Sequence, residues 1–353
     1  MSQVIPDVHQ WENLTFPKSL PHFMKLFPDD AACATYLEGA RWPKGFACPN
    51  CNAKGEPFRF AAKPGVLRCK ACRKDVALTA GTVMQRTHTP LTTWFWGAYL
   101  VSSMTPGISA VQFQKQLGLT RYETAFQLLH KLRAGMVRPG RDRIGGNLSR
   151  NDHVEVDETW IGGSTRGEGR GVHNQVLVAA AAEVRQRPAK KGDKPLAAGA
   201  ARRGGRYAGR LRLEIVRSRH ATALGDFVEQ AVAPGAMVIT DAWSGYGSLK
   251  DRGYDHLPVA ECGDPTVAEE YLPIVHLVFG NLKAWLHGTH HGRVEPKHLQ
   301  TYLNEFTFRF NRRFYPFNAF RSLLGIGTNG EGPTYADLYS GEWKHLTMAS
   351  RHG

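Results

Sequence analysis

The chain has 353 residues, 42% of them hydrophobic and 22% charged, which is an ordinary composition for a globular protein of two or three domains. It lacks the roughly 20-residue apolar run that a membrane-spanning helix needs, and we see no basic stretch followed by an apolar one that would mark a secretory signal. We therefore expect a cytoplasmic protein with no membrane partner. The formal net charge of +14 favours a polyanionic partner such as nucleic acid.

Residues 1–45 are predicted to be a helical lead-in, since their apolar residues recur at helical spacing. Asp29 or Asp30 is placed to cap a helix that we expect to run to about Glu38. Cys33 lies on this helix without a cysteine neighbour at metal-binding spacing, so we expect it to be a buried thiol and not a ligand.

Residues 46–80 carry two C-x-x-C pairs, whose spacing predicts a structural zinc ribbon. Thiolates at positions i and i+3 of two tight turns suit one tetrahedral Zn²⁺, and the chain between the turns would form a hairpin. A domain this small needs its metal in order to fold. The four predicted zinc ligands are Cys48, Cys51, Cys69 and Cys72. Basic residues surround them, and this basic surface either contacts DNA or is simply solvated.

Residues 89–140 are predicted to form a helical region that resembles a helix-turn-helix. A short helix ends at Gly118, and a second helix that bears Arg121, Tyr122 and Lys131 follows. In such a pair the second helix can enter the major groove of DNA, so these three side chains are candidate DNA contacts. A plain helical hairpin is the alternative.

A polar, glycine-bearing linker leads to a predicted catalytic domain over 150–325. Its first strand alternates apolar residues and delivers Asp157, while a later apolar strand ends on Asp241. A carboxylate at the end of a buried strand is costly unless it is paired, and a divalent cation is a common partner. Two such strands side by side would present both aspartates to one pair of Mg²⁺ (or Mn²⁺) ions, the arrangement used for two-metal phosphoryl transfer.

The order of the predicted elements indicates an α/β fold of the ribonuclease-H-like type, with a mixed five-stranded sheet and flanking helices. Three antiparallel strands, interrupted by a basic insert at about 185–209, are followed by a helix over roughly 221–232 and then by the Asp241 strand. In this layout the first acid sits on strand one and the second at the end of strand four, where Asp157 and Asp241 fall.

Two further helices are predicted, one from about residue 274 and one over 297–313, before a C-terminal tail at 326–353. One face of the second helix carries an acid and two guanidinium groups: Glu305, Arg309 and Arg312. These side chains form either a surface ladder of ion pairs or a face turned toward DNA or the metal site.

The zinc ribbon and four later stretches together resemble bacterial insertion-sequence transposases of the DDE class, in the subgroup with an N-terminal zinc ribbon (ISXO-two-like). The stretches are, in order, VEVDETWIGG, VITDAWSGY, NLKAWLHGTHHG and YLNEFTFRFNRR, and the resemblance spans roughly residues 20–325. It implies a ribonuclease-H-like fold, a magnesium pair, and cleavage and strand transfer at the ends of a mobile element. It also implies double-stranded DNA as partner (element ends and target), a homo-oligomer on that DNA, and a cytoplasmic protein associated with the bacterial nucleoid when bound.

The resemblance further implies a third catalytic residue, a glutamate followed two turns later by Lys or Arg, but the helix after Asp241 contains no acid. Lys283 supplies the basic residue, expected to contact a phosphate. Seven residues before it lies His276, and Asn281 is the other candidate. We favour Asn281, because its carbonyl oxygen can ligate Mg²⁺ whereas hard cations bind imidazole poorly. Glu305 on the next helix is a further source of negative charge.

Two alternative functions stay open at this stage. A ribonuclease-H-like nuclease would cut DNA without joining it. A catalytically decayed relative would keep the DNA-binding regions and act as a regulator, and the missing glutamate keeps this alternative in view.

Overall fold

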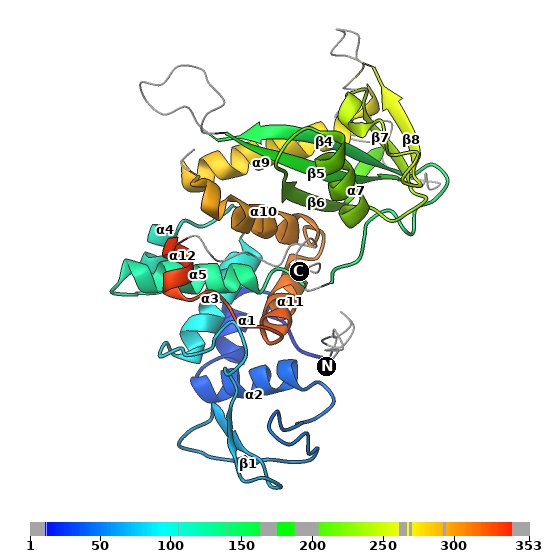
Figure 1. Ribbon diagram of the computed structural model, residues 1–353. Helices are drawn as coiled ribbons and strands as arrows, with labels where there is room; N and C mark the ends of the chain where they lie inside the picture. The colour runs from blue at the N-terminus through cyan, green and yellow to red at the C-terminus, as the bar shows by residue number, and fades with distance from the viewer. Residues whose placement is uncertain are drawn as a thin grey trace, which may run out of the picture. The chain divides into compact units, whose positions relative to one another are not determined.

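A computed structural model describes residues 11, 13–104, 106–138, 140–162, 175–187, 205–260, 267, 270–291 and 294–340. The chain forms two compact units, one of Met1–Pro139 with Arg312–His345 and one of Gly140–Asn311 with Leu346–Gly353 (Figure 1). Most of the predicted basic insert, residues 188–204, lies outside the described residues. Within the described part of the chain, every helix is too short or too polar to cross a membrane.

The first unit is mainly helical. Its helices are α1 (Leu20–Leu26), α2 (Asp30–Arg41), α3 (Leu91–Ser103), α4 (Ala110–Gln116), α5 (Tyr122–Ala134), α11 (Pro316–Gly327) and α12 (Tyr335–Ser340). The predicted cap of α2 is confirmed, because the Asp29 side chain accepts a hydrogen bond from Ala32 N at 2.8 Å. The glycine turn between α4 and α5 is also present, with Gly118 at φ 62°.

The core of this unit draws on a segment that the sequence predicts to be part of the catalytic domain. Phe320 of α11 packs against Phe27 and Phe95, with ring centroids 5.5 and 5.9 Å apart. These contacts place α11 in the first unit, so the second unit ends its main segment at Asn311 and not near residue 325.

The ribbon region is a small antiparallel sheet of β1 (Phe58–Arg59), β2 (Val66–Arg68) and β3 (Asp75–Ala77). Leu67 and Val76 are register partners on its one buried face. Helix α2 holds the sheet through Arg41, whose guanidinium donates to Ala77 O and Leu78 O at 2.9 and 2.8 Å. The ribbon thus has little apolar core of its own.

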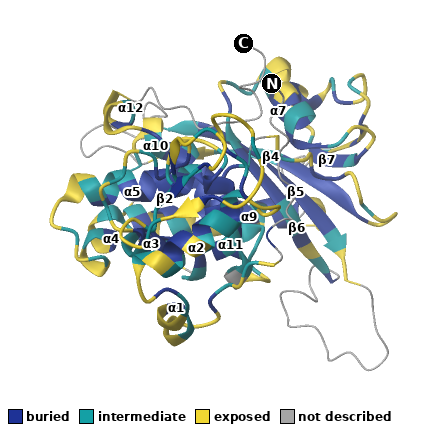
Figure 2. Ribbon diagram, turned by 90° about the horizontal axis from the view of Figure 1, so that it is seen from below, coloured by how far each residue is buried: buried dark blue, intermediate teal, exposed yellow. Residues whose placement is uncertain are grey.

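The second unit is built on the strands β4 (His153–Ile161), β5 (Val176–Gln186), β6 (Arg206–Ile215), β7 (Met237–Asp241) and β8 (Asp255–Val259). Their order is β6-β5-β4-β7-β8, with β4, β5 and β6 antiparallel and β4, β7 and β8 parallel. This mixed five-stranded sheet confirms the ribonuclease-H-like prediction. Its central strands are largely buried (Figure 2).

Helices cover both faces of this sheet. Helix α7 (Ala221–Ala231) packs with Val154 and Val156 on one face, next to the short helix η3 (Ser244–Tyr246). Helices α9 (Pro273–His290) and α10 (Pro296–Phe310) pack on the other. The three helices predicted after β6 are therefore confirmed, and each sheet face has its own apolar core.

Candidate functional site

The two predicted aspartates occupy matching positions on neighbouring parallel strands. Val156 of β4 pairs with Thr240 of β7, so Asp157 and Asp241 stand at the next position of the register. Adjacent strands lie about 4.8 Å apart, and the alternation of side chains places both carboxylates on the face that α9 covers. The pairing of β4 with β7 thus brings together two aspartates that are more than eighty residues apart in the sequence.

Helix α9 adds two side chains beside this pair of aspartates. His276 Nε2 lies 3.2 Å from Asp157 Oδ2, and Lys283 Nζ donates a hydrogen bond of 2.8 Å to Thr159 Oγ1. Residues seven apart share a helix face, and positions 157 and 159 share a strand face. Helix α9 therefore lies along β4 with its His276–Lys283 face toward the strand.

The other two candidates for the third position lie elsewhere. Asn281 follows His276 by five residues, about 140° around the helix, and is exposed. Glu305 is buried on α10, where it pairs with Arg309 at 3.1 Å. Helix α10 packs on the outer strand β6, which is separated from β4 by β5. The structure thus brings His276 to Asp157 and places neither Asn281 nor Glu305 beside it.

The environment of Asp241 disfavours a bare negative charge. Burial, followed by the negative charges of Asp157 and Glu158, raises the pKa of Asp241 to about 6, although Trp243 N donates to its Oδ1 at 3.3 Å. A terminal nitrogen of Arg219 lies 4.0 Å from Asp241 Oδ2. Carboxylate oxygens are the ligands that a hard divalent cation prefers, and a bound cation would offset the repulsion between these partly buried carboxylates. The residues therefore fit Mg²⁺.

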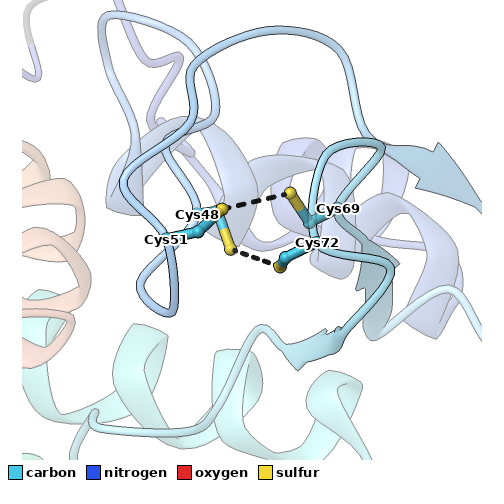
Figure 3. A group of neighbouring side chains, drawn as sticks. All are labelled: Cys48, Cys51, Cys69 and Cys72. Carbon is cyan, nitrogen blue, oxygen red and sulfur yellow. Dashed lines mark hydrogen bonds between the residues drawn. The ribbon is translucent and has the colours of Figure 1, made fainter.

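The four cysteines of the ribbon converge on one point. Their Sγ atoms all lie within 4.8 Å of one another, and the Cys48–Cys72 and Cys51–Cys69 sulfurs are 3.7 Å apart (Figure 3). A tetrahedral zinc with Zn–S bonds of 2.3 Å would hold its sulfurs about 3.8 Å apart, so the cluster can bind zinc. Within the described part of the chain, no other group of three or more histidine, cysteine or acidic side chains gathers this closely.

Both cysteine turns have the same backbone geometry. Asn52 N donates to Cys48 O at 2.8 Å, and Arg73 N donates to Cys69 O at 3.0 Å. Asn52 and Arg73, each directly after the second cysteine of its pair, are left-handed with φ of 58° and 61°. The two tight turns that the spacing predicted are therefore present.

Comparison with known families agrees with this geometry. The model described as "ISXO2-like transposase domain" matches residues 149–311, and the model described as "Transposase zinc-ribbon domain" matches residues 28–75. Together they cover more than half of the chain. This chain belongs to the ISXO2-like transposases. No curated protein and no solved structure matches it.

One residue that positions α9 in this transposase was missed by the sequence analysis. Glu155 is fully buried on β4, and its Oε2 accepts hydrogen bonds from Ile274 N and Val275 N at 2.8 and 2.7 Å. It thereby satisfies two free N–H groups at the start of α9, where the helix dipole favours a negative charge. A buried acid two residues before Asp157, on the same strand face, was the available signal.

The sequence analysis also missed a hydrogen-bonded group near Asp241, formed by Glu158, Arg219 and Tyr246. The buried side chain of Glu158 accepts hydrogen bonds from Arg219 Nε and Tyr246 Oη. Burial and the Glu158 charge raise the pKa of Tyr246 well above its ordinary value, so the phenol keeps its proton for this bond. Arg219 lies in a polar stretch between β6 and α7, and no motif in the sequence singles it out.

The predicted DNA contacts of the transposase divide into two groups. Arg121 and Tyr122 are exposed where α5 begins. Lys131 is buried, with its amine donating to Gln85 O at 2.9 Å and its pKa lowered by burial. Arg309 is committed to Glu305, and burial lowers the pKa of Arg312 to about 10. The structure leaves Arg121 and Tyr122 as the exposed members of the predicted set.

Proposed function

We propose that this transposase binds the ends of its insertion sequence in the bacterial cytoplasm and catalyses cleavage and strand transfer of DNA at Asp157 and Asp241. The observation that carries the proposal is the β4–β7 register, which sets the two carboxylates side by side, facing α9. Together with the family match, this supports metal-dependent phosphoryl transfer.

Asp157 and Asp241 would hold Mg²⁺ (or Mn²⁺), which when bound supplies an activated attacking oxygen and stabilises charge on the phosphate. The protein's own groups then have separate tasks. His276 holds Asp157 by its hydrogen bond, and we now favour it over Asn281 and Glu305 at the third position, as an orienting group and not as a metal ligand. Lys283, whose Nζ donates a hydrogen bond to Thr159 Oγ1, would donate to a phosphate oxygen of the DNA.

The first unit would recognise the element end. We propose that Cys48, Cys51, Cys69 and Cys72 hold one structural Zn²⁺, and that the basic ribbon and the start of α5 contact the DNA. Tetrahedral thiolate ligation would fix the hairpin, which has little apolar core of its own. We further propose that the protein acts on DNA as a homo-oligomer, because two element ends must be joined to one target.

The test compares Asp157→Asn and Asp241→Asn with Asp255→Asn, an exposed aspartate at the start of β8. The substrate is DNA that flanks the gene. We expect each catalytic-site variant to lose at least about 1000-fold in cleavage, because the metal supplies several kcal/mol, while DNA binding is kept. The control variant should cleave normally. Cleavage at the wild-type rate by either Asp157→Asn or Asp241→Asn would refute the assignment.

A second assay separates the proposed function from its alternatives. A pre-cut element end is offered together with a circular target, and joining is measured. Joining is expected of a transposase, whereas cutting without joining would identify a nuclease. Sequence-specific binding without either reaction would identify a regulator.

A further inference from the structure

Two side chains beside Asp241, the exposed Trp243 and the partly exposed Arg219, pack against one another. Arg219 Cζ lies 4.2 Å from the centroid of the Trp243 ring, and Trp243 Nε1 donates to Arg219 O at 3.0 Å. The Trp243 residue is nevertheless 42% exposed, and the Arg219 side chain is 38% exposed. An indole and a guanidinium are thus held in place while open to solvent.

The pair is anchored from the protein interior. Glu158, buried at 1% exposure, accepts hydrogen bonds from Arg219 Nε and from the fully buried Tyr246. Gly245 lies so close to Arg219 O that any Cβ there would clash with it. The loop before α7 and the loop after β7 are therefore in close contact, and the bond from Arg219 Nε to Glu158 holds the guanidinium beside Trp243.

The chemistry of this surface fits one nucleotide. A guanidinium recognises phosphate oxygens, and an indole stacks on a base of any sequence. The guanidinium also reaches to 4.0 Å from Asp241 Oδ2, so a phosphate that it binds lies next to the proposed catalytic carboxylates. In an intact duplex the base faces are already stacked, so the base that meets Trp243 must be unpaired.

We propose that Arg219 and Trp243 form a subsite for an unpaired nucleotide adjoining the bond that is cut. Arg219 holds its phosphate, Trp243 stacks on its base, and Glu158 positions Arg219. The subsite rests on the proposed function, since it takes the DNA to be bound at Asp157 and Asp241. A purely structural role for the pair, in which Arg219 only neutralises Glu158, would give no dependence on any single base.

The experiment measures binding of the full chain to a duplex from the gene's flanking DNA that ends in a short single-stranded tail. Binding is measured in Ca²⁺, to prevent cutting, with one tail base removed at a time. Removing the base at one position should weaken wild-type binding about tenfold, the size expected of one base–aromatic stack. Trp243→Ala should lose this dependence and Trp243→Phe should keep it.

Trp160→Ala is the matched control, because Trp160 is 41% exposed on the neighbouring strand β4 and should leave the base dependence unchanged. A methylphosphonate at the phosphate of the same nucleotide should weaken the wild type but not Arg219→Gln. Equal losses for wild type and Trp243→Ala at every position, or no loss at any position, would overturn the subsite.

Cleavage and joining of DNA by the wild type in Mg²⁺ separate this result from the proposed function. If the base dependence is present but the wild type neither cleaves nor joins DNA in Mg²⁺, the subsite stands and the proposed reaction fails. If the wild type cleaves without any base dependence, the reaction stands and the subsite fails.

Discussion

The zinc ribbon and the carboxylate edge, by which we mean Asp157 and Asp241 on the adjacent strands β4 and β7, each gather ligand groups, but by different means. The ribbon takes all four thiols from residues 48–72, on two turns of identical backbone geometry. The edge takes Asp157 and Asp241 from strands more than eighty residues apart. Thiols tolerate each other when protonated, whereas carboxylates repel each other. Burial first, and then the charges of Asp157 and Glu158, raise the pKa of Asp241 to about 6.

The two sites also differ in the residues that hold their ligand groups in place. The ribbon is ordered by its own turns and by Arg41 of α2. The carboxylate edge depends on side chains from several elements: Glu155 fixes the start of α9, His276 holds Asp157, and Arg219 offsets negative charge. A site assembled from distant strands needs support from several elements, whereas the ribbon takes its support from its own turns and one helix.

The largest expected effect tests whether the ribbon depends on its metal alone. Replacing Cys48 and Cys69 together by serine should abolish zinc binding and unfold the hairpin, because structural zinc contributes about 10–16 kcal/mol in small metal domains. Zinc content and protease sensitivity of residues 46–80 are the measurements. Cys33→Ala, outside the cluster, should keep its zinc. Unchanged zinc in the double variant would remove the zinc assignment.

A smaller effect is expected where Glu155 supports the carboxylate edge. Glu155→Ala leaves two buried N–H groups without an acceptor and should lower the free energy of unfolding by about 2–4 kcal/mol. Glu155→Gln keeps an acceptor and should lose less. Chemical denaturation measures both, and Glu229→Ala, which breaks an exposed ion pair with Arg252, should change stability by under about 1 kcal/mol. Equal stability of Glu155→Ala and wild type would show that the cap is dispensable.

The next expected effect is the loss of cleavage rate when the third residue of the site is replaced. His276→Ala should slow cleavage about 100-fold, since losing the contact to Asp157 misplaces a reacting group. Asn281→Ala, on an exposed part of the same helix, should stay near the wild-type rate. Single-turnover cleavage in Mg²⁺ measures both. The reverse order of effects would return Asn281 to the third position.

The smallest effect concerns the burial of Asp241 and its repulsion from neighbouring carboxylates. Its pKa is raised from the ordinary value of 3.8 to about 6, so its contribution to stability is complete below about pH 4 and is lost as the pH rises through 6. At pH 8 without divalent metal, Asp241→Asn should therefore be more stable than wild type by about 1–2 kcal/mol, and this gain should vanish near pH 4.

Thermal melting with and without Mg²⁺ checks this prediction. Added Mg²⁺ should raise the melting temperature of the wild type more than that of Asp241→Asn. The exposed Asp255→Asn variant should follow the wild type at every pH. If Asp241→Asn were less stable than wild type at pH 8, the costs of burial and repulsion at Asp241 would already be fully offset in the folded protein.

Several features were determined by local sequence alone. Cysteines three residues apart define a tight turn, and alternating apolar residues define strands, because both depend on neighbours within a few positions. The element order then predicted the ribonuclease-H-like layout, in which Asp157 and Asp241 lie on the neighbouring strands β4 and β7. The helices after β7 and the apolar face of α10 were predictable for the same reason.

Other features were decided only by tertiary structure. Which face of α9 meets β4 depends on where Glu155 starts the helix, and this selects His276 over Asn281. Burial of Lys131, the packing of α11 in the first unit and the approach of Arg219 to Asp241 depend equally on distant contacts. Helix and strand periodicity fixes which residues share a face, but the partner of that face is set by long-range packing and by the compensation of buried charge.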